Sequence, residues 1–375
     1  MVAGRPARPR HLPHRAWPQP AWRLAARSAR SQGRSKPVVT NAMQATPPRM
    51  NGSTSTTVLQ AEDLSLFLRT HQGGHLKIVD GVTFTIGKGD FYAVVGESGS
   101  GKTVLGRSIM RLFPPSMLRM EGKLSLNGVD LVSAPSSQVQ TMRGRVVSMI
   151  FQEPMTSLNP LMTVERQIAE ALAVAGGGSR RERSERVLDL LASVQFADPK
   201  SVRSMYPHEL SGGMRQRAMI AMALANNPAL LIADEPTTAL DVTIQQEIMQ
   251  LLLRLRDQHA LSILFISHDL SLVRRYADRI GVLYGGVLME SGPADQLIDH
   301  PTHPYSRALV DCIPRRREGG RRQAGIEGQV PGVANWFEGC RFAPRCPRVQ
   351  DDCRRGEIPL RTTKTAQAAR CLYPQ

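Results

Sequence analysis

Eight consecutive residues have the types and spacing of a phosphate-binding loop. Glycines let the backbone turn so that its N–H groups converge on phosphate oxygens, and a following helix adds the positive end of its dipole. Lys102 would neutralise charge on the β- and γ-phosphates of a nucleotide, and the Thr103 hydroxyl would be a Mg²⁺ ligand. The alternative is a glycine-rich turn that fits the pattern by chance. The loop, of the form G-x-x-x-x-G-K-[ST], consists of Gly96, Glu97, Ser98, Gly99, Ser100, Gly101, Lys102 and Thr103.

An acidic pair is the second candidate for chemistry on phosphates. Asp234 and Glu235 follow the apolar run Ala229–Ala233, which has the length of a buried strand. Carboxylates at the C-terminal end of a strand lie where α/β sheets bind ligands. Asp234 would hold Mg²⁺ through water, and Glu235 could orient or deprotonate an attacking water. Such a pair alone is usually solvated surface, but beside a phosphate loop it indicates nucleotide hydrolysis.

The segments around these residues have the apolar patterns of β-strands and of a helix. In Val58–Arg69 three leucines alternate with other residues, as in a half-buried strand, and a second strand is expected at Val82–Ile86. Phe91–Val95 is an apolar run that ends at the phosphate loop, which is typical of a strand buried on both faces. The helix after the loop is expected at Val104–Leu112. We therefore predict an α/β fold with its chemistry at strand ends.

A third motif, Leu210-Ser211-Gly212-Gly213-Met214-Arg215-Gln216, resembles that of the ATP-binding cassette (ABC) ATPases. Its Ser-Gly-Gly opens a predicted helix, Met214–Ala225, and offers a second helix N-terminus to an anion. In that family these residues, here Ser211, Gly212 and Gly213, face the γ-phosphate bound by another subunit. The resemblance implies ATP and Mg²⁺ as cofactors and a head-to-tail dimer, in which one chain alone cannot complete a site.

Further matches follow in the order of the same family. Gln152 resembles the Q-loop glutamine, which the family places at Mg²⁺, and Asp241 resembles the aspartate of the D-loop. His268 resembles the switch histidine, which contacts the γ-phosphate and the attacking water; alone, it would most often be an ordinary histidine at a strand end. The resemblance implies catalytic roles for Glu235, His268 and Gln152, Mg²⁺ contacts for Gln152, and a nucleotide-binding role for Asp241.

The resemblance extends over residues 58–291 and implies a fold. It is an α/β P-loop NTPase (RecA-like) core with an antiparallel β subdomain and an inserted helical subdomain at about residues 153–226. One position departs from the family, whose members usually stack adenine on an aromatic side chain near the end of the first strand. The aligned residue is Leu68, and Phe67 points to the opposite face of a regular strand. Either the strand is bulged and Phe67 stacks, or base stacking is weak.

Two segments indicate one branch of the family. Residues 151–160 (FQEPMTSLNP) closely resemble the ATPase subunits of bacterial dipeptide and oligopeptide importers, including the related nickel importers. Residues 303–309 (HPYSRAL) resemble the start of their C-terminal extension, which would here span 292–375. The resemblance implies a separately encoded second ATPase subunit, two transmembrane permease subunits, an extracytoplasmic solute-binding protein, and a peripheral location at the cytoplasmic face of the bacterial inner membrane. The expected function is ATP hydrolysis coupled to uptake of di- or oligopeptides or a related solute.

Four cysteines cluster in this extension, at Cys340, Cys346, Cys353 and Cys371. Zinc sites more often contain a pair about two to four residues apart, which this spacing lacks. Members of the resembled branch carry a four-iron four-sulfur ([4Fe-4S]) cluster here, so the resemblance favours that group, with zinc and free thiols as the alternatives. Disulfides are disfavoured in a reducing cytoplasm. Cys312 has no partner in this pattern.

The positive charge of the chain is concentrated at its N-terminus. The formal net charge is +16, and residues 1–50 supply +10 of it through nine Arg and one Lys without any acidic residue. Residues 1–57 show no apolar periodicity, so we expect a disordered tail. The composition resembles an organelle transit peptide, or sequence upstream of a true start at Met43 or Met50. A nucleic-acid-binding arm is the third alternative.

Composition excludes several classes of protein. With 41% hydrophobic and 21% charged residues, the chain is not wholly disordered, collagen-like or coiled coil. No apolar run approaches the roughly 20 residues needed to span a bilayer. The rival function, a soluble ABC-type ATPase acting on nucleic acid or ribosomes, rests on the net charge. We disfavour it, and expect no nucleic-acid partner, because the charge lies mostly in the tail and soluble members typically carry two cassettes in one chain.

Overall fold

The computed structural model of the chain describes residues 57–70, 73–152, 157–176, 178–238, 240–313, 325–333, 336, 338–363 and 366–375. The predicted disordered tail lies outside the described residues except for Thr57, which begins the first strand. Residues 153–156 of the predicted Q-loop segment and Ala239 of the predicted D-loop also lie outside them.

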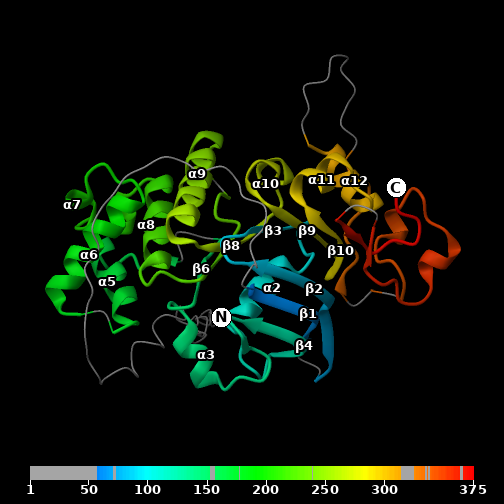
Figure 1. Cartoon of the computed structure of the whole chain (residues 1–375), viewed down its shortest axis with the longest axis horizontal. Coiled ribbons are helices and arrows are strands. Elements are labelled where there is room, and N and C mark those ends of the chain that lie inside the picture. The colour runs from blue at the N-terminus through cyan, green and yellow to red at the C-terminus, as the bar shows by residue number, and fades with distance from the viewer. Residues whose placement is uncertain are drawn as a thin grey trace, which may run out of the picture.

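An eight-stranded sheet lies at the centre of the structure, between the group of helices α5 to α8 and the C-terminal segment (Figure 1). Its order is β11-β12-β10-β9-β3-β8-β7-β6, and the strands from β9 to β6 run parallel. They are buried on both faces, which accounts for their nearly unbroken apolar sequences. Their bounds are Phe91–Val95 (β3), Val147–Ile150 (β6), Leu230–Asp234 (β7), Ser262–Ser267 (β8) and Arg279–Tyr284 (β9).

Helices cover both faces of this sheet. Successive strand residues point to opposite faces, so Ala93 lies in the core beneath α8 and α9, and Val94 lies in the core beneath α2. α2 ends earlier than the predicted Leu112, because Arg111 has a left-handed φ of 46° that breaks the helix. The bounds are Lys102–Ile109 (α2), Gly212–Leu224 (α8), Val242–His259 (α9) and Leu270–Tyr276 (α10).

A second, antiparallel sheet of order β2-β1-β4-β5 packs beside α2. β1 is bulged: Asp63 has a φ of 49°, and the pairing with β2 changes register at several points. The predicted second strand, Val82–Ile86, is only the end of β2, because the bulged pairing hides the alternation of the residues before it. The elements are Thr57–Arg69 (β1), His75–Gly87 (β2), Leu118–Leu126 (β4), Val129–Asp130 (β5) and the helix Ser136–Met142 (α3).

Helices α5 to α8 lie together at the end of the molecule opposite the C-terminal segment (Figure 1). Val164, Ile168 and Leu172 recur every fourth residue and are all buried, a periodicity typical of an amphipathic helix. Ser179 and Glu182 form a capping box that starts α6 after the glycine-rich stretch. The bounds are Val164–Ala173 (α5), Arg180–Ser193 (α6) and Pro199–Val202 (α7), followed by a 3₁₀ turn at Pro207–Glu209.

The C-terminal segment joins the other side of the central sheet. β10 runs antiparallel to β9, and the short strands β12 and β11 extend the sheet beyond it. Phe342 is buried in the core that this segment shares with the sheet. The elements are Val287–Pro293 (β10), Ala294–Asp299 (α11), Pro304–Asp311 (α12), Arg361–Thr362 (β11), Ala368–Ala369 (β12), and 3₁₀ turns at Ala343–Arg345 and Asp351–Arg354.

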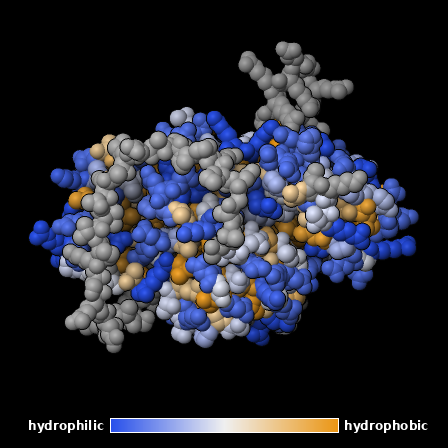
Figure 2. Space-filling model, in the orientation of Figure 1, coloured by the Kyte–Doolittle hydropathy of each residue, from blue (hydrophilic) through white to orange (hydrophobic). Residues whose placement is uncertain are grey.

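The exterior is mainly polar on the face shown in Figure 2, where hydrophobic residues form small scattered patches. Among the described residues, no helix combines the length and the apolar character needed to cross a bilayer.

Candidate nucleotide site

The phosphate loop connects the buried strand β3 to the N-terminus of α2, as predicted. Gly101 has a φ of 98°, a conformation that L side chains rarely adopt. Gly96 is required for space, because a Cβ there would lie 2.0 Å from the carbonyl oxygen of Leu283. The loop therefore depends on glycine at these two positions, and it directs the first N–H groups of an eight-residue helix toward the sheet edge.

Lys102 lies folded back on the loop that precedes it. Its Nζ donates to the carbonyl oxygens of Gly96 at 2.7 Å and of Glu97 at 2.9 Å. Burial lowers the pKa of Lys102, while the carboxylates of Glu235, Asp234 and Glu97 act in the opposite direction. The ammonium thus holds the loop together in this state, and it could exchange these carbonyls for phosphate oxygens.

Thr103 and Asp234 are brought together from the start of α2 and the end of β7. The Thr103 hydroxyl donates to Asp234 Oδ1 at 2.9 Å. Asp234 is fully buried, and burial raises the pKa of its carboxyl, opposed by the hydrogen bond from Thr103. The other oxygen, Oδ2, has no hydrogen-bond partner within the described part of the chain. A hydroxyl beside a buried carboxylate with an unsatisfied oxygen is a suitable set of groups for Mg²⁺ and its water.

Glu235 is surrounded by three polar side chains from different elements. Gln152 Nε2 lies 3.1 Å, Thr238 Oγ1 3.0 Å and His268 Nδ1 3.2 Å from Glu235 Oε2. Glu235 has a φ of 48°, and its N–H donates to the carbonyl of Ile266 on β8. Since 59% of the His268 side chain and 14% of the Glu235 side chain are exposed, the carboxylate is sheltered while the imidazole faces solvent. The predicted catalytic residues are therefore neighbours.

The Ser-Gly-Gly motif and Asp241 begin two other helices. Ser211 caps α8, accepting a hydrogen bond from the N–H of Met214 at 3.3 Å. Asp241 caps α9 through the N–H of Ile244 at 3.0 Å. Gly213 packs against α9, where a Cβ would lie 3.0 Å from Ile244 Cγ2. These helices cover the face of the sheet opposite α2. The N-terminus of α8, with its Ser-Gly-Gly motif, and the N-terminus of α2, with the phosphate loop, therefore belong to different layers of one chain.

An apolar groove lies between the sheet edge at β6 and the helices α5 and α8. It has a volume of about 120 Å³. Two of its residues, Ile150 and Phe151, directly precede Gln152, so the groove adjoins the candidate catalytic cluster. Leu161, after the Q-loop segment, is 84% exposed. The methionines that line the groove are Met110, Met149, Met219 and Met222.

The region expected to receive the base offers no aromatic ring in the aligned position. The ring of Phe67 is covered by Arg119, whose guanidinium lies 4.4 Å from the ring centre. Leu68 points to the opposite face and pairs with Leu76 and Leu118. The pairing between β1 and β2 shifts register next to Phe67. The extra residue at this shift is Ile78 of β2, whereas β1 pairs regularly with β4 from Ser65 to Leu68. The bulge of β1 is at Asp63 and not at Phe67, and the guanidinium of Arg119 covers the Phe67 ring.

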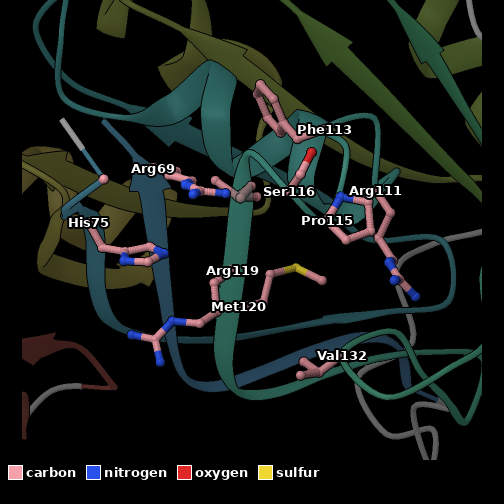
Figure 3. A pocket seen from close by; sticks show the side chains of 11 residues that line it. Arg69, His75, Arg111, Phe113, Pro115, Ser116, Arg119, Met120 and Val132 are labelled. Carbon is pink, nitrogen blue, oxygen red and sulfur yellow. The ribbon is translucent and has the colours of Figure 1, made fainter. Parts of the chain in front are cut away.

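A cleft of about 420 Å³ opens beside the end of β1. Figure 3 shows that Arg69 and His75 point into its centre, whereas Arg111 and Arg119 point outward in different directions. Arg111 is also bonded to the carbonyl of Ala134, and Arg119 lies 2.6 Å from Glu121. The basic side chains of this cleft thus do not converge on one point as they would around a bound anion.

Sequence reasoning missed contacts that the C-terminal segment makes with the loop. Arg345 binds the carboxylate of Glu97, and the Tyr305 hydroxyl accepts a hydrogen bond from the Glu97 N–H at 3.0 Å. Thr238 was missed as well. The nearby sequence holds the signals: Tyr305 lies in the HPYSRAL segment, and Arg345 lies between two of the clustered cysteines.

Four cysteines line one small cavity in the C-terminal segment, as their spacing suggested. They are Cys340, Cys346, Cys353 and Cys371, and none forms a disulfide. Burial raises the pKa of Cys340 to about 11 and also raises that of Cys346 and Cys371. Among the described residues, no group of three or more His, Cys, Asp or Glu side chains is arranged to hold a metal ion. The iron–sulfur interpretation thus has suitable donors but no preformed site.

A phosphate loop between a buried parallel strand and a helix, with a carboxylate at the end of a nearby strand, defines a P-loop nucleoside triphosphatase. Comparison with known proteins identifies the family within this class. The sequence profile of the ABC transporter family matches residues 79–238, and that of the oligopeptide/dipeptide transporter C-terminal region matches residues 289–353. The chain belongs to the ABC transporter family, and its enzymatic activity is ATP hydrolysis.

Relatives and solved structures agree with this assignment. The chain is 44% identical over 298 residues to the dipeptide transport ATP-binding protein of Escherichia coli, covering 80% of this chain and 91% of the relative. It is 46% identical over 299 residues to the oligopeptide transport ATP-binding protein of Bacillus subtilis, covering 79% and 91%. A dimeric ATP-binding cassette bound to ADP and Pi matches with a TM-score of 0.56 and 27% identity, over 63% of this chain and 98% of that one. The predicted fold class is confirmed.

Proposed function

We propose that the chain is the ATP-hydrolysing subunit of an importer of dipeptides, oligopeptides or a related solute, at the cytoplasmic face of a bacterial inner membrane. The observation that carries the proposal is the Glu235 cluster at the end of β7, in a chain that also contains the peptide-transporter C-terminal region. The relatives named for dipeptide and oligopeptide transport support the solute class. No observation favours action on nucleic acid.

The proposed mechanism assigns a task to each part of the site. The phosphate loop and Lys102 bind the β- and γ-phosphates, and Thr103 and Asp234, with Gln152, hold Mg²⁺, which when bound neutralises charge on the phosphates. Glu235 takes or orients a proton of the attacking water, and its sheltered carboxylate is the acceptor that this step needs. His268, 3.2 Å from Glu235, contacts the γ-phosphate and keeps that water in place.

Completion of the site requires a second subunit in the proposed mechanism. Ser211, Gly212 and Gly213 begin α8, on the face of the sheet opposite α2. In the dimer, their N–H groups would reach the γ-phosphate of the nucleotide that the partner subunit binds. Asp241, which caps α9, would lie at the same interface. We propose a separately encoded ATPase paralogue as that partner. Two permease subunits and an extracytoplasmic solute-binding protein would complete the importer. The boundaries 58–291 for the ATPase domain, 153–226 for its helical subdomain and 292–375 for the extension belong to this proposal.

The methionine-lined groove is the proposed docking site for a permease helix. It adjoins Gln152, so that movement of a docked helix would reach the catalytic cluster. Met222→Glu places a charge in this groove, and we expect solute uptake in cells to fall at least about tenfold, since an unpaired charge is costly in an apolar contact. Basal ATPase activity of the chain purified with its partner subunit should stay within about twofold.

The control for this variant is Ala192→Glu, at an exposed position of α6 in the same group of helices. It should leave both uptake and ATPase activity unchanged. Normal uptake by the Met222→Glu variant at matched expression would contradict the assignment of the groove.

The cysteine cavity is the proposed site of a [4Fe-4S] cluster. Four thiols without disulfides around one cavity are the donors that such a cluster needs, and Arg348, which lines the same cavity, offers a cation to thiolates. We expect anaerobically purified protein to contain about four irons per chain and to absorb near 400 nm, and Cys353→Ser to lose both. Stoichiometric zinc, or titration of all five cysteine thiols without metal, would reject the cluster.

A further inference from the structure

The phosphate loop is held from outside by the C-terminal segment. Nη1 of Arg345 lies 2.9 Å from Oε1 and 3.1 Å from Oε2 of Glu97, and Nη2 lies 3.2 Å from Oε2. Only 5% of the Arg345 side chain and 28% of the Glu97 side chain are exposed. A charge-assisted contact to both carboxylate oxygens fixes orientation as well as distance, so it is stronger than an exposed surface ion pair.

Arg345 is itself fixed by contacts that do not involve Glu97. Its Nε donates to the carbonyl of Glu327 at 2.7 Å, and Nη2 donates to the carbonyl of Ile326 at 3.1 Å. The preceding turn is anchored by Phe342, whose ring packs edge-on against Tyr284 at 5.4 Å between ring centres. The position of the guanidinium is therefore fixed by the C-terminal segment itself, and its contact with Glu97 restrains the phosphate loop.

Glu97 is held on three sides. Its N–H donates to the Tyr305 hydroxyl at 3.0 Å, its carbonyl accepts from Lys102 at 2.9 Å, and its carboxylate binds Arg345. When Lys102 turns to phosphate oxygens, it must give up the carbonyls of Gly96 and Glu97. The contacts from Tyr305 and Arg345 are then the ones among these three that keep Glu97 in place.

A second contact connects the same segment to the loop. Arg341 donates to the carbonyl of Gly285, and the next residue, Gly286, donates its N–H to the carbonyl of Ser100 at 2.9 Å. Arg341 and Arg345 both lie between Cys340 and Cys346 in the sequence. The stretch between Cys340 and Cys346 thus contacts the phosphate loop directly through Arg345, and indirectly through Arg341 and the turn at Gly285 and Gly286.

We propose that Arg345 is a positioning residue for nucleotide binding: through Glu97 it holds the phosphate loop in the shape that receives the phosphates. The C-terminal segment then sets the affinity of the site for ATP as well as extending the sheet. This inference rests on the proposed role of residues 96–103 as the nucleotide site.

The test is a double-mutant cycle in the full chain, with MgATP as the ligand. Arg345→Met and Glu97→Gln should each raise the Kd and the KM for MgATP about tenfold, with kcat changed less than about threefold. The double variant should be no weaker than either single variant, because both substitutions remove one interaction. Arg345→Lys, which keeps the charge but not the two-pronged contact, should fall between. Arg354→Met, at an exposed position of the same segment, is the control and should bind like the wild type.

Four results separate a failure of this inference from a failure of the proposed function. Wild-type affinity in Arg345→Met, or losses that add in the double variant, overturns the proposal. Early thermal unfolding of Arg345→Met with an unchanged Kd assigns the residue to stability alone and also overturns it. Full affinity in a Lys102→Ala variant instead shows that the nucleotide site is elsewhere, which is a failure of the proposed function.

Discussion

Replacing Glu235 by Gln should reduce the kcat for ATP hydrolysis by about 10² to 10⁴-fold, the range expected for loss of a general base. Gln has nearly the shape of Glu, so the contacts with Gln152, Thr238 and His268 can largely persist, whereas the proton acceptor is lost. Binding of ATP should remain, and an ATP-bound dimer with the partner subunit should accumulate. Steady-state ATPase assays and size-exclusion chromatography with MgATP measure the two effects.

The matched control is Glu247→Gln on α9, which removes a carboxylate that pairs with Arg217 at 2.8 Å, away from the site. It should keep kcat within about twofold of the wild type, because Glu247 itself is half exposed and partly exposed ion pairs contribute little. Near-normal turnover by the Glu235→Gln variant would remove Glu235 from its proposed role.

Replacing Lys102 by Ala should raise the Kd for MgATP about 100-fold or more. The ammonium would make charge-assisted contacts to two phosphate groups, and each hydrogen bond to a charged group contributes about 1.5–3 kcal/mol. The variant also loses the bonds from Lys102 to the carbonyls of Gly96 and Glu97, so the loop itself is loosened. Isothermal titration with MgATP gives the affinity directly.

Lys88→Ala provides the control for Lys102, since Lys88 is an exposed lysine just before β3. Its affinity for MgATP should equal that of the wild type. If both variants bind MgATP equally well, the phosphate loop is not the nucleotide site.

The site could be predicted from the sequence because its parts are short and local. The phosphate loop, the pair Asp234 and Glu235, and His268 each follow an apolar strand, and parallel strands place their C-terminal ends at one edge of a sheet. In the structure, the side chains of Gln152 and His268 each lie within hydrogen-bonding distance of the Glu235 carboxylate. Their catalytic roles stay predictions that the variants above test.

Other features depended on long-range packing and left no local pattern. Arg345 contacts Glu97 across 248 residues of sequence, and nothing in either segment specifies the other. Extra residues of β2 opposite the segment 64–67 of β1 interrupted the alternation that would have revealed the full length of β2. The end of α2 was placed three residues too late, because the left-handed Arg111 is not a residue type that normally ends a helix.

The cysteine cavity could be predicted from the sequence only in part. The spacing of the cysteines predicted that they belong together, and Cys340, Cys346, Cys353 and Cys371 do line one cavity. Whether the cavity holds a metal depends on sulfur positions that the spacing does not determine, and the described residues contain no ready-made metal site. Spacing therefore predicted proximity, whereas the identity of the occupant requires the iron measurement.

Uptake of a labelled dipeptide tests directly whether ATP hydrolysis by this chain drives peptide import. It is measured in cells that express either this chain or its Glu235→Gln variant at matched levels, with nickel uptake measured in parallel. ATP hydrolysis coupled to peptide import predicts dipeptide uptake with the wild-type chain and loss of that uptake with the variant. Loss of nickel uptake alone would identify the solute as nickel, as in the related nickel importers. Unchanged uptake of both solutes in the variant would show that hydrolysis at Glu235 does not drive import.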